Sequence, residues 1–155
     1  MLGQLLQAEI FAIFLVFTRL GAAIMVMPGF GEIYIPTNVR LAVAVSITLA
    51  LGPVVAPLMP AQPADPLTLF LIVAGEIVIG LMIGSIARLS MTALHVSGTV
   101  IAFQSSLAFA LTMDPTQGIQ GALIASLFSL MGVVLIFSTG MHHMLIQAMY
   151  DSYVL

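Results

Sequence analysis

Residues 67–88, LTLFLIVAGEIVIGLMIGSIAR, decide the fold expected of this chain. The run is apolar over the roughly 20 residues that a helix needs to cross a bilayer. Glu76, Gly80 and Gly84 recur every fourth residue in it and therefore share one helix face. Small residues in such a row let two helix backbones approach closely inside a membrane. The stretch predicts a membrane helix that packs tightly against another helix through the face of Glu76.

The composition of the whole chain has the same character. Hydrophobic residues make up 61% of the 155 positions and charged residues only 6%. A soluble domain carries several times more charge, so this composition describes a chain embedded in membrane lipid or buried among partners. The net charge of −3 and the lack of a basic patch argue against binding to nucleic acid. The absence of Cys excludes disulfides and thiolate chemistry.

Five apolar segments near membrane-spanning length can be drawn, followed by a short amphipathic helix. They cover residues 10–27, 39–59, 67–87, 89–113 and 119–138, and the amphipathic helix covers 141–154. Pro28-Gly29 and Pro36 interrupt the helices around the first loop, and Gly140 is expected to end the fifth segment. Prolines at every third residue from 57 to 66 predict an extended connector. We therefore expect an all-α fold of membrane-associated helical hairpins.

Arginines near two helix ends suggest an orientation for these hairpins. Arg40 opens the second segment and Arg88 closes the third, while the connector between those segments carries no cation. Because cationic residues favour the cytoplasmic side, residues 57–66 are expected on the opposite side of the membrane.

The run from residue 97 to residue 118 is unusually polar for an apolar segment, with Thr99, Gln104, Ser105, Ser106 and Thr112 in its middle. Hydrocarbon offers such groups no hydrogen-bond partners, so the run is expected to face other helices or a water-filled path. Small residues at intervals of four support close helix contact: Gly98, Ala102, Ser106 and Ala110, and then Gly121, Ala125 and Ser129. An Asp114-Pro115-x-Gln117 capping box predicts a sharp turn into the next helix.

Two charged residues lie within the apolar segments, Arg19 in the first and Glu76 in the third. An unpaired charge at such depth costs at least about 2.5 kcal/mol, so each charge needs a partner or water. One interpretation is a site for a transported ion or proton. The other, which we favour, is an ion pair with each other or with neighbouring subunits. A transporter usually brings several acids together, whereas only one lies here.

Other candidate sites for chemistry are weaker. His142 and His143 are adjacent, so on a helix their side chains point about 100° apart and do not chelate a metal from one face. Ser105 and Ser106 are expected to bond to a neighbouring backbone rather than to attack a substrate. We expect no enzyme, no metal site and no cofactor.

Several groups of residues recur in the order and spacing of a known family. They are Phe17-Thr18-Arg19, Pro28-Gly29-Phe30-Gly31 and residues 35–40; Gly75-Glu76 with Gly80 and Gly84; Gly98, Gln104, Leu107, Ala110 and Asp114-Pro115; and residues 140–143 with Ser152-Tyr153. In this arrangement the chain resembles the FliR family of flagellar export-gate proteins, whose injectisome relatives are called SctT.

The resemblance implies a non-enzymatic pore subunit in the bacterial inner membrane, at the flagellar basal body. It implies partners of the FliP, FliQ, FlhB and FlhA families, and unfolded export substrates that pass through the pore. The loop at about 104–113 would help to close the pore, through the residues Gln104, Ser105, Ser106, Leu107, Phe109 and Met113. The polar and small residues would instead hold helices or subunits together: Arg19, Arg40, Glu76, Gly80, Gly84, Asp114 and Pro115.

The chain departs from the family in two respects. Ser106 stands where the family has Gly, which bears on the geometry of the loop tip. Family members also continue with further C-terminal helices, so the single domain over 1–155 is expected to be the N-terminal part of such a protein. The sequence does not decide whether the chain belongs to a flagellum or to an injectisome. The alternatives to a gate subunit are a small ion or solute transporter using Glu76 and Arg19, and a membrane fragment that only interacts with partners.

Overall fold

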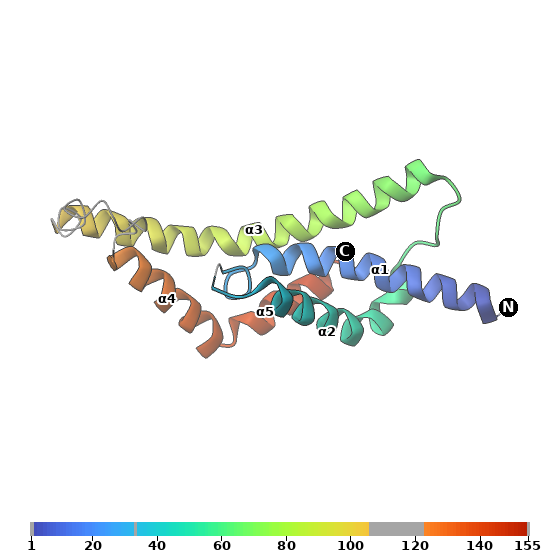
Figure 1. The fold of residues 1–155 in the computed structure, drawn as a ribbon, viewed down its shortest axis with the longest axis horizontal. Helices are drawn as coiled ribbons and strands as arrows, with labels where there is room; N and C mark the ends of the chain where they lie inside the picture. Colours follow the sequence, from blue (N-terminus) through green and yellow to red (C-terminus); the bar gives the residue numbers. More distant parts are fainter. Residues whose placement is uncertain (1, 33, 106–122, 155) are drawn as a thin grey trace. The chain divides into compact units, whose positions relative to one another are not determined.

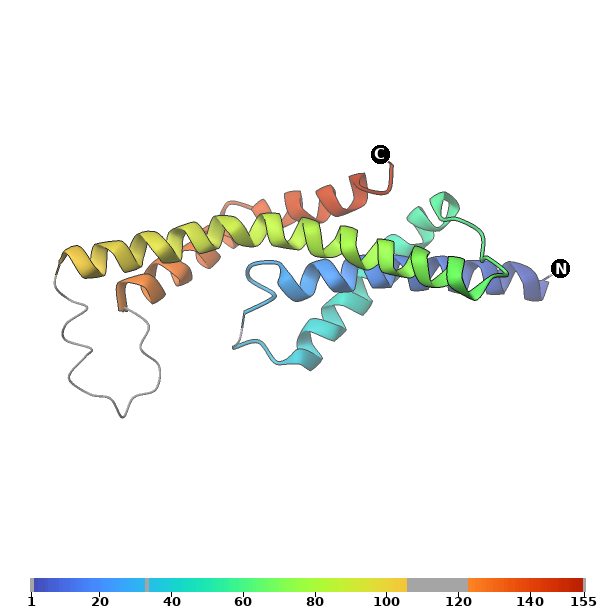
Figure 2. The ribbon, with the colours of Figure 1, turned by 90° about the horizontal axis from the view of Figure 1, so that it is seen from above.

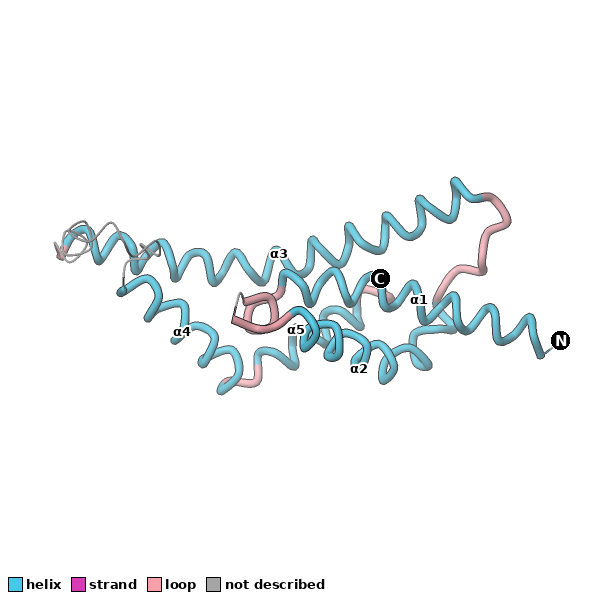
Figure 3. Tube along the Cα trace, viewed as in Figure 1, coloured by secondary structure: helices cyan, strands magenta, loops and turns pink. Residues whose placement is uncertain are grey.

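The computed structural model describes residues 2–32, 34–105 and 123–154, and the regular structure in them is entirely helical (Figure 3). In chain order the described elements are α1 (Leu2–Val26), α2 (Thr37–Val55), the short 3-10 helix η1 (Ala56–Leu58), α3 (Pro66–Gln104), α4 (Leu123–Ser138) and α5 (Met141–Asp151) (Figure 1). The predicted all-α class is confirmed.

The chain divides into two compact units, which are described separately. The main unit consists of Met1–Ala87 together with His143–Leu155, and the hairpin unit consists of Arg88–His142. Within the described residues, three stretches are long and apolar enough to cross a membrane: Ala8–Val26, Thr37–Leu58 and Pro66–Gln104. A fourth is possible if α4 and α5 count as one broken span.

The core of the main unit forms where α1, α2 and α5 meet. Its buried members are Val16, Leu20, Ala23, Met27, Val55 and Met149. On α1 these residues recur every three or four positions, so they form one stripe of the helix. The packed face of α2 is made of small residues at intervals of four, including Ala44, Thr48 and Gly52. A Cβ at Gly52 would lie 3.3 Å from Ile13 Cγ1, which shows how closely α2 approaches α1.

The loop between α1 and α2 begins with the glycine turn that the sequence predicts. Gly29 has a φ of 89°, a left-handed conformation that side chains disfavour. Arg40 then closes the loop from the first turns of α2, donating from Nη2 to the Glu32 carbonyl at 2.7 Å and from Nε to the Ile35 carbonyl at 3.1 Å. The predicted stop at Gly140, after α4, also adopts a positive φ, of 73°.

The proline-rich connector ends in a helix cap that sequence reasoning missed. Asp65 Oδ2 accepts hydrogen bonds from the backbone N–H of Thr68 at 3.1 Å and from its hydroxyl at 3.0 Å. Pro66 occupies the first helical position, where its missing N–H costs nothing. These bonds to the ionised form lower the pKa of Asp65, with the Thr68 backbone N–H as the largest cause.

The predicted break near residue 88 is wrong. The segment expected over 67–87 and the described part of the one expected over 89–113 belong to one continuous helix, α3, which runs through Arg88 to Gln104. A charge does not break a helix, whereas Pro or a glycine turn does, and α3 contains no Pro after its first residue. Most of the other described boundaries agree with the predicted segments to within a few residues, except that α1 begins earlier, at Leu2. The predicted end at 113 and the predicted start at 119 fall outside the described part of the chain.

Candidate functional site

A buried ion pair joins α1 to α3 in the main unit, where the two helices run side by side (Figure 2). Arg19 Nε donates to Glu76 Oε2 at 2.6 Å, and Arg19 Nη2 donates to Glu76 Oε1 at 3.0 Å. The two side chains are only 7% and 9% exposed. Paired N–H···O bonds from one guanidinium to one carboxylate are the strongest arrangement open to these groups. The structure therefore forms the mutual pair that the sequence offered as one alternative.

The third nitrogen of Arg19 binds the end of the described chain. Arg19 Nη1 donates to the Ser152 carbonyl at 2.8 Å and to the Ser152 hydroxyl oxygen at 3.1 Å. The Tyr153 ring covers the guanidinium, with its centroid 4.0 Å from Arg19 Cζ, a cation–π contact. Each of the three guanidinium nitrogens thus has an acceptor. Among the described residues, no buried side-chain nitrogen or oxygen lacks a hydrogen-bond partner.

Gly80 and Gly84, which share the face of Glu76, explain how α3 comes close enough to α1 to form the pair. A Cβ at Gly80 would overlap the backbone carbonyl oxygen of Arg19 itself, and it would lie 3.1 Å from Ala22 Cβ. A Cβ at Gly84 would lie 2.6 Å from the Ala23 carbonyl oxygen. The row that the sequence singled out is therefore the surface on which α1 lies.

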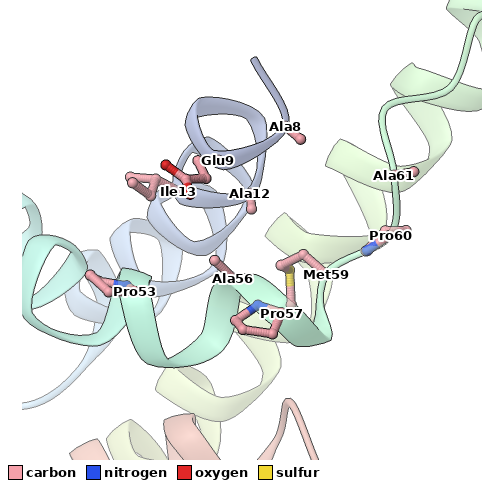
Figure 4. A pocket seen from close by; sticks show the side chains of 10 residues that line it. All are labelled: Ala8, Glu9, Ala12, Ile13, Pro53, Ala56, Pro57, Met59, Pro60 and Ala61. Atoms are coloured by element: carbon pink, nitrogen blue, oxygen red, sulfur yellow. The ribbon is translucent and has the colours of Figure 1, made fainter. Parts of the chain in front are cut away.

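A cleft of about 510 Å³ opens elsewhere in the main unit, between the start of α1 and the connector (Figure 4). Its lining is apolar except for the carboxylate of Glu9: Ala8, Glu9, Ala12, Ile13, Pro53, Ala56, Pro57, Met59, Pro60 and Ala61. Neither Arg19 nor Glu76 lines it, so the buried ion pair and the cleft are separate features.

In the hairpin unit, the two predicted small-residue rows meet. A Cβ at Gly98 on α3 would lie 2.6 Å from Ala125 Cα on α4. Ala102 and Ala125 are both fully buried at this contact face. One turn away, His95 Nδ1 lies 3.2 Å from Ser129 Oγ. The second half of α3 and α4 therefore form a closely packed helical hairpin.

Of the residues expected to close a pore, the structure describes Gln104 and Ser105, at the end of α3. Gln104 is the last residue of α3 and Ser105 follows it, with the Ser105 hydroxyl donating to the Ile101 carbonyl at 2.7 Å. Both side chains are exposed. The other predicted residues between 104 and 115 lie outside the described part of the chain: Ser106, Leu107, Phe109, Met113, Asp114 and Pro115.

Arg40 and His142, two other residues considered in the sequence, have local contacts. Arg40 donates to backbone carbonyls of its own loop, as described above. His142 lies against Phe137, with ring centroids 5.1 Å apart, and its Nδ1 is 3.4 Å from the Ile136 carbonyl.

Sequence reasoning missed the roles of Ser152 and Tyr153 at the buried pair. Ser152 acts through a backbone carbonyl, which every residue possesses, so no pattern of residue types indicates it. In the sequence, only the family resemblance, which includes Ser152-Tyr153, indicates that this segment matters.

Comparison with known proteins identifies a family profile and relatives of this chain. The sequence profile of the bacterial export proteins, family 1, matches residues 10–155. The flagellar biosynthetic protein FliR of Caulobacter vibrioides is 37% identical over 145 residues, covering 94% of this chain and 58% of that protein. The FliR protein of Bacillus subtilis is 29% identical over 143 residues, covering 92% of this chain and 54% of that protein.

A relative with a different name matches over nearly the whole chain. The Yop proteins translocation protein T of Yersinia pestis is 27% identical over 155 residues, covering 99% of this chain and 59% of that protein. The chain thus spans just over half the length of the curated relatives that it matches. With a family profile that covers nearly all of its residues, the chain belongs to the bacterial export proteins, family 1.

Proposed function

We propose that the chain is a structural subunit of a flagellar-type, or type III, protein export apparatus in the bacterial inner membrane, at the flagellar basal body. Its relatives are named for flagellar biosynthesis and for Yop translocation, which supports a role in protein export. The apolar helices support a place in the membrane. Its partners in this proposal are subunits of the FliP, FliQ, FlhB and FlhA families, together with unfolded export substrates.

The complete bonding of Arg19 is the observation that favours a structural role over transport. A transport site must exchange its ligands with an ion, a proton or water. Here both Glu76 oxygens accept from Arg19, and the third guanidinium nitrogen is bonded to Ser152. Opening this network would leave a buried charge without a partner, which costs about 3–5 kcal/mol. The pair is suited to holding α1, α3 and the segment after α5 in one register.

We further propose that residues 104–113 help to close the export pore when no substrate passes. The close contact of Gly98 with Ala125 supports this proposal, because it gives α3 and α4 a firm hairpin from which a short closing segment can extend. Gln104 and Ser105 at its base are exposed and polar, as a segment that contacts water or other subunits would be.

Two experiments in the bacterium that makes this protein test these proposals. Deleting the gene should abolish export of flagellar building blocks, and continued export would refute the export role. Deleting residues 105–109 should let small ions leak across the membrane, measured as loss of membrane potential. Replacing residues 61–64 of the connector by Gly and Ser is the matched control and should leave the ion barrier intact. An intact barrier after the 105–109 deletion would refute the closing role.

The alternative of a small ion or solute transporter makes the opposite prediction for the isolated chain. Purified chain in lipid vesicles would then take up ions in a pH-dependent manner, and Glu76→Gln would abolish the uptake. We expect no uptake, because a gate subunit without its partners has no pore of its own.

A further inference from the structure

The cleft between the start of α1 and the connector lies at the ends of two membrane-length helices. Ala8–Val26 and Thr37–Leu58 are each apolar and long enough to cross a bilayer. The α1 residues of the lining belong to the first turns of one span, and Pro53, Ala56 and Pro57 belong to the last turns of the other. Figure 4 shows the α1 residues on one side of the cleft, with Pro57 and Met59 on the other. The cleft is therefore expected where the hydrocarbon of the bilayer meets the lipid headgroups.

The lining of this cleft can accept hydrogen bonds but has little to donate. Its one polar side chain is that of Glu9, which when ionised has acceptor oxygens only. Three of the ten lining residues are Pro53, Pro57 and Pro60, which have no backbone N–H. For the same reason Pro57 supplies no helical donor to the Pro53 carbonyl, four residues earlier. A ligand of this cleft should be apolar over most of its surface and should bring its own donor.

The charge of the lining distinguishes among the lipids of a membrane. The Glu9 side chain is exposed, and the ten lining residues include no cation. The ion pair within the main unit joins Arg19 to Glu76 and does not involve Glu9. An anionic headgroup would be repelled by the Glu9 carboxylate and would find no cation there. A quaternary ammonium has a positive charge but no N–H, whereas a primary ammonium has the charge and three N–H donors.

We propose that this cleft binds one phospholipid with a primary ammonium headgroup, such as phosphatidylethanolamine. The ammonium donates to the Glu9 carboxylate, and part of one acyl chain lies in the apolar space between Ala12, Ala56 and Met59. The volume of about 510 Å³ lies within the range of about 300–1,000 Å³ that is usual for small-ligand sites. Met59 is unbranched and flexible, so it can adapt to a mobile chain. The site is independent of the proposed role in export.

A lipid titration of the purified full chain, followed by native mass spectrometry, tests the headgroup chemistry. Three lipids with identical acyl chains are compared: phosphatidylethanolamine, phosphatidylcholine and phosphatidylglycerol. One phosphatidylethanolamine should bind per chain, and the other two should bind at least about tenfold more weakly, because each lacks the charged N–H donor. Equal affinity for all three lipids would indicate a non-specific lipid coat and would overturn the proposal. A preference for phosphatidylglycerol would also overturn it.

Two pairs of variants test the residues in the same titration. Glu9→Gln should lower the affinity for phosphatidylethanolamine about tenfold, and Ala61→Phe, which fills the cleft, should lower it by at least as much. Glu32→Gln removes a carboxylate from the loop after α1, and Ala64→Phe enlarges an exposed connector residue outside the lining, so both should bind as the wild type does. Circular dichroism should show the same helix content in all four. Unchanged affinity in Glu9→Gln or in Ala61→Phe would overturn the site.

Photo-crosslinking in native membranes tests the place of the lipid and the identity of the occupant. Phosphatidylethanolamine with a photoreactive acyl chain should form adducts within residues 8–13 and 53–61 of the full chain. A photoreactive amino acid at position 61 should in turn form adducts with lipid. Lipid adducts spread evenly over all helices would overturn the proposal. Adducts of position 61 with a protein segment would do the same, since they would show that a protein occupies the cleft.

Discussion

Replacing Gly80 by Ala should destabilise the main unit more than any other single methyl group added to α3. The new Cβ would overlap the backbone carbonyl oxygen of Arg19 and would lie 3.1 Å from Ala22 Cβ. Because that oxygen belongs to the backbone of α1, it cannot rotate away as a flexible side chain can. The two helices must separate instead, and the same shift pulls Arg19 away from Glu76.

The magnitude follows from two opposing effects. Ala stabilises a helix interior over Gly by about 1 kcal/mol, whereas overpacking a close contact costs about 1–3 kcal/mol. At Gly80 the cost should lie at the upper end, because the contact is with backbone, so the free energy of unfolding should fall by about 2 kcal/mol. Gly75 is the matched control, since it lies on the same helix and a Cβ there meets nothing within 4 Å. Gly75→Ala should be neutral or stabilising by up to about 1 kcal/mol.

The assay is reversible unfolding of the purified chain in mixed detergent micelles, followed by the circular dichroism of its helices. The free energies of unfolding of the two variants should differ by about 2–3 kcal/mol, in favour of Gly75→Ala. Equal free energies would refute the close contact of α3 with α1 at Gly80, and with it the account of how the buried pair is positioned.

Three further outcomes are expected. Glu76→Gln should lower the free energy of unfolding by about 3–5 kcal/mol, and the double variant Arg19→Met with Glu76→Leu should recover most of that loss, which a double-mutant cycle measures. Gly98→Ala should loosen the α3–α4 hairpin by about 1–3 kcal/mol and speed amide hydrogen exchange in α4, while exchange in α2 stays unchanged. Asp65 has a folded-state pKa below its ordinary value of 3.8, so its stabilisation of α3 should be present above pH 3.8 and be lost as the pH falls through the lower folded-state value. The Thr68 amide chemical shift should report that titration, and Asp65→Asn should remove it.

The sequence predicted the helices and their contact faces because both follow from local chemistry. Apolar stretches of sufficient length form helices, and small residues every four positions mark where Gly80 meets α1 and where Gly98 meets Ala125. The sequence does not predict that α3 continues through Arg88, because an arginine there is expected to end a segment. A charged residue bears on membrane orientation, whereas helix ends depend on capping groups, Pro and Gly.

The capping role of Asp65 was available from the sequence and was overlooked. Asp65-Pro66 followed by Thr68 has the same Asp-Pro start as Asp114-Pro115, where a helix start was predicted. The contact of Arg19 with Ser152 is different in kind, because it joins residues 133 positions apart through a backbone carbonyl. Such a contact depends on the complete arrangement of helices and has no local signature.

The bonding of Arg19 also has a consequence for the order in which the chain is made. Arg19 and Glu76 enter the membrane early, but the acceptors for Arg19 Nη1 belong to Ser152 and are synthesised much later. At about 5–20 residues per second, the ribosome needs several seconds to travel from codon 76 to codon 152. During that interval the nascent helices carry a buried guanidinium whose Nη1 has no acceptor from Ser152. The bonds from Arg19 Nη1 to Ser152 are therefore the last of this network to form, and the network is complete only when the segment after α5 has been made.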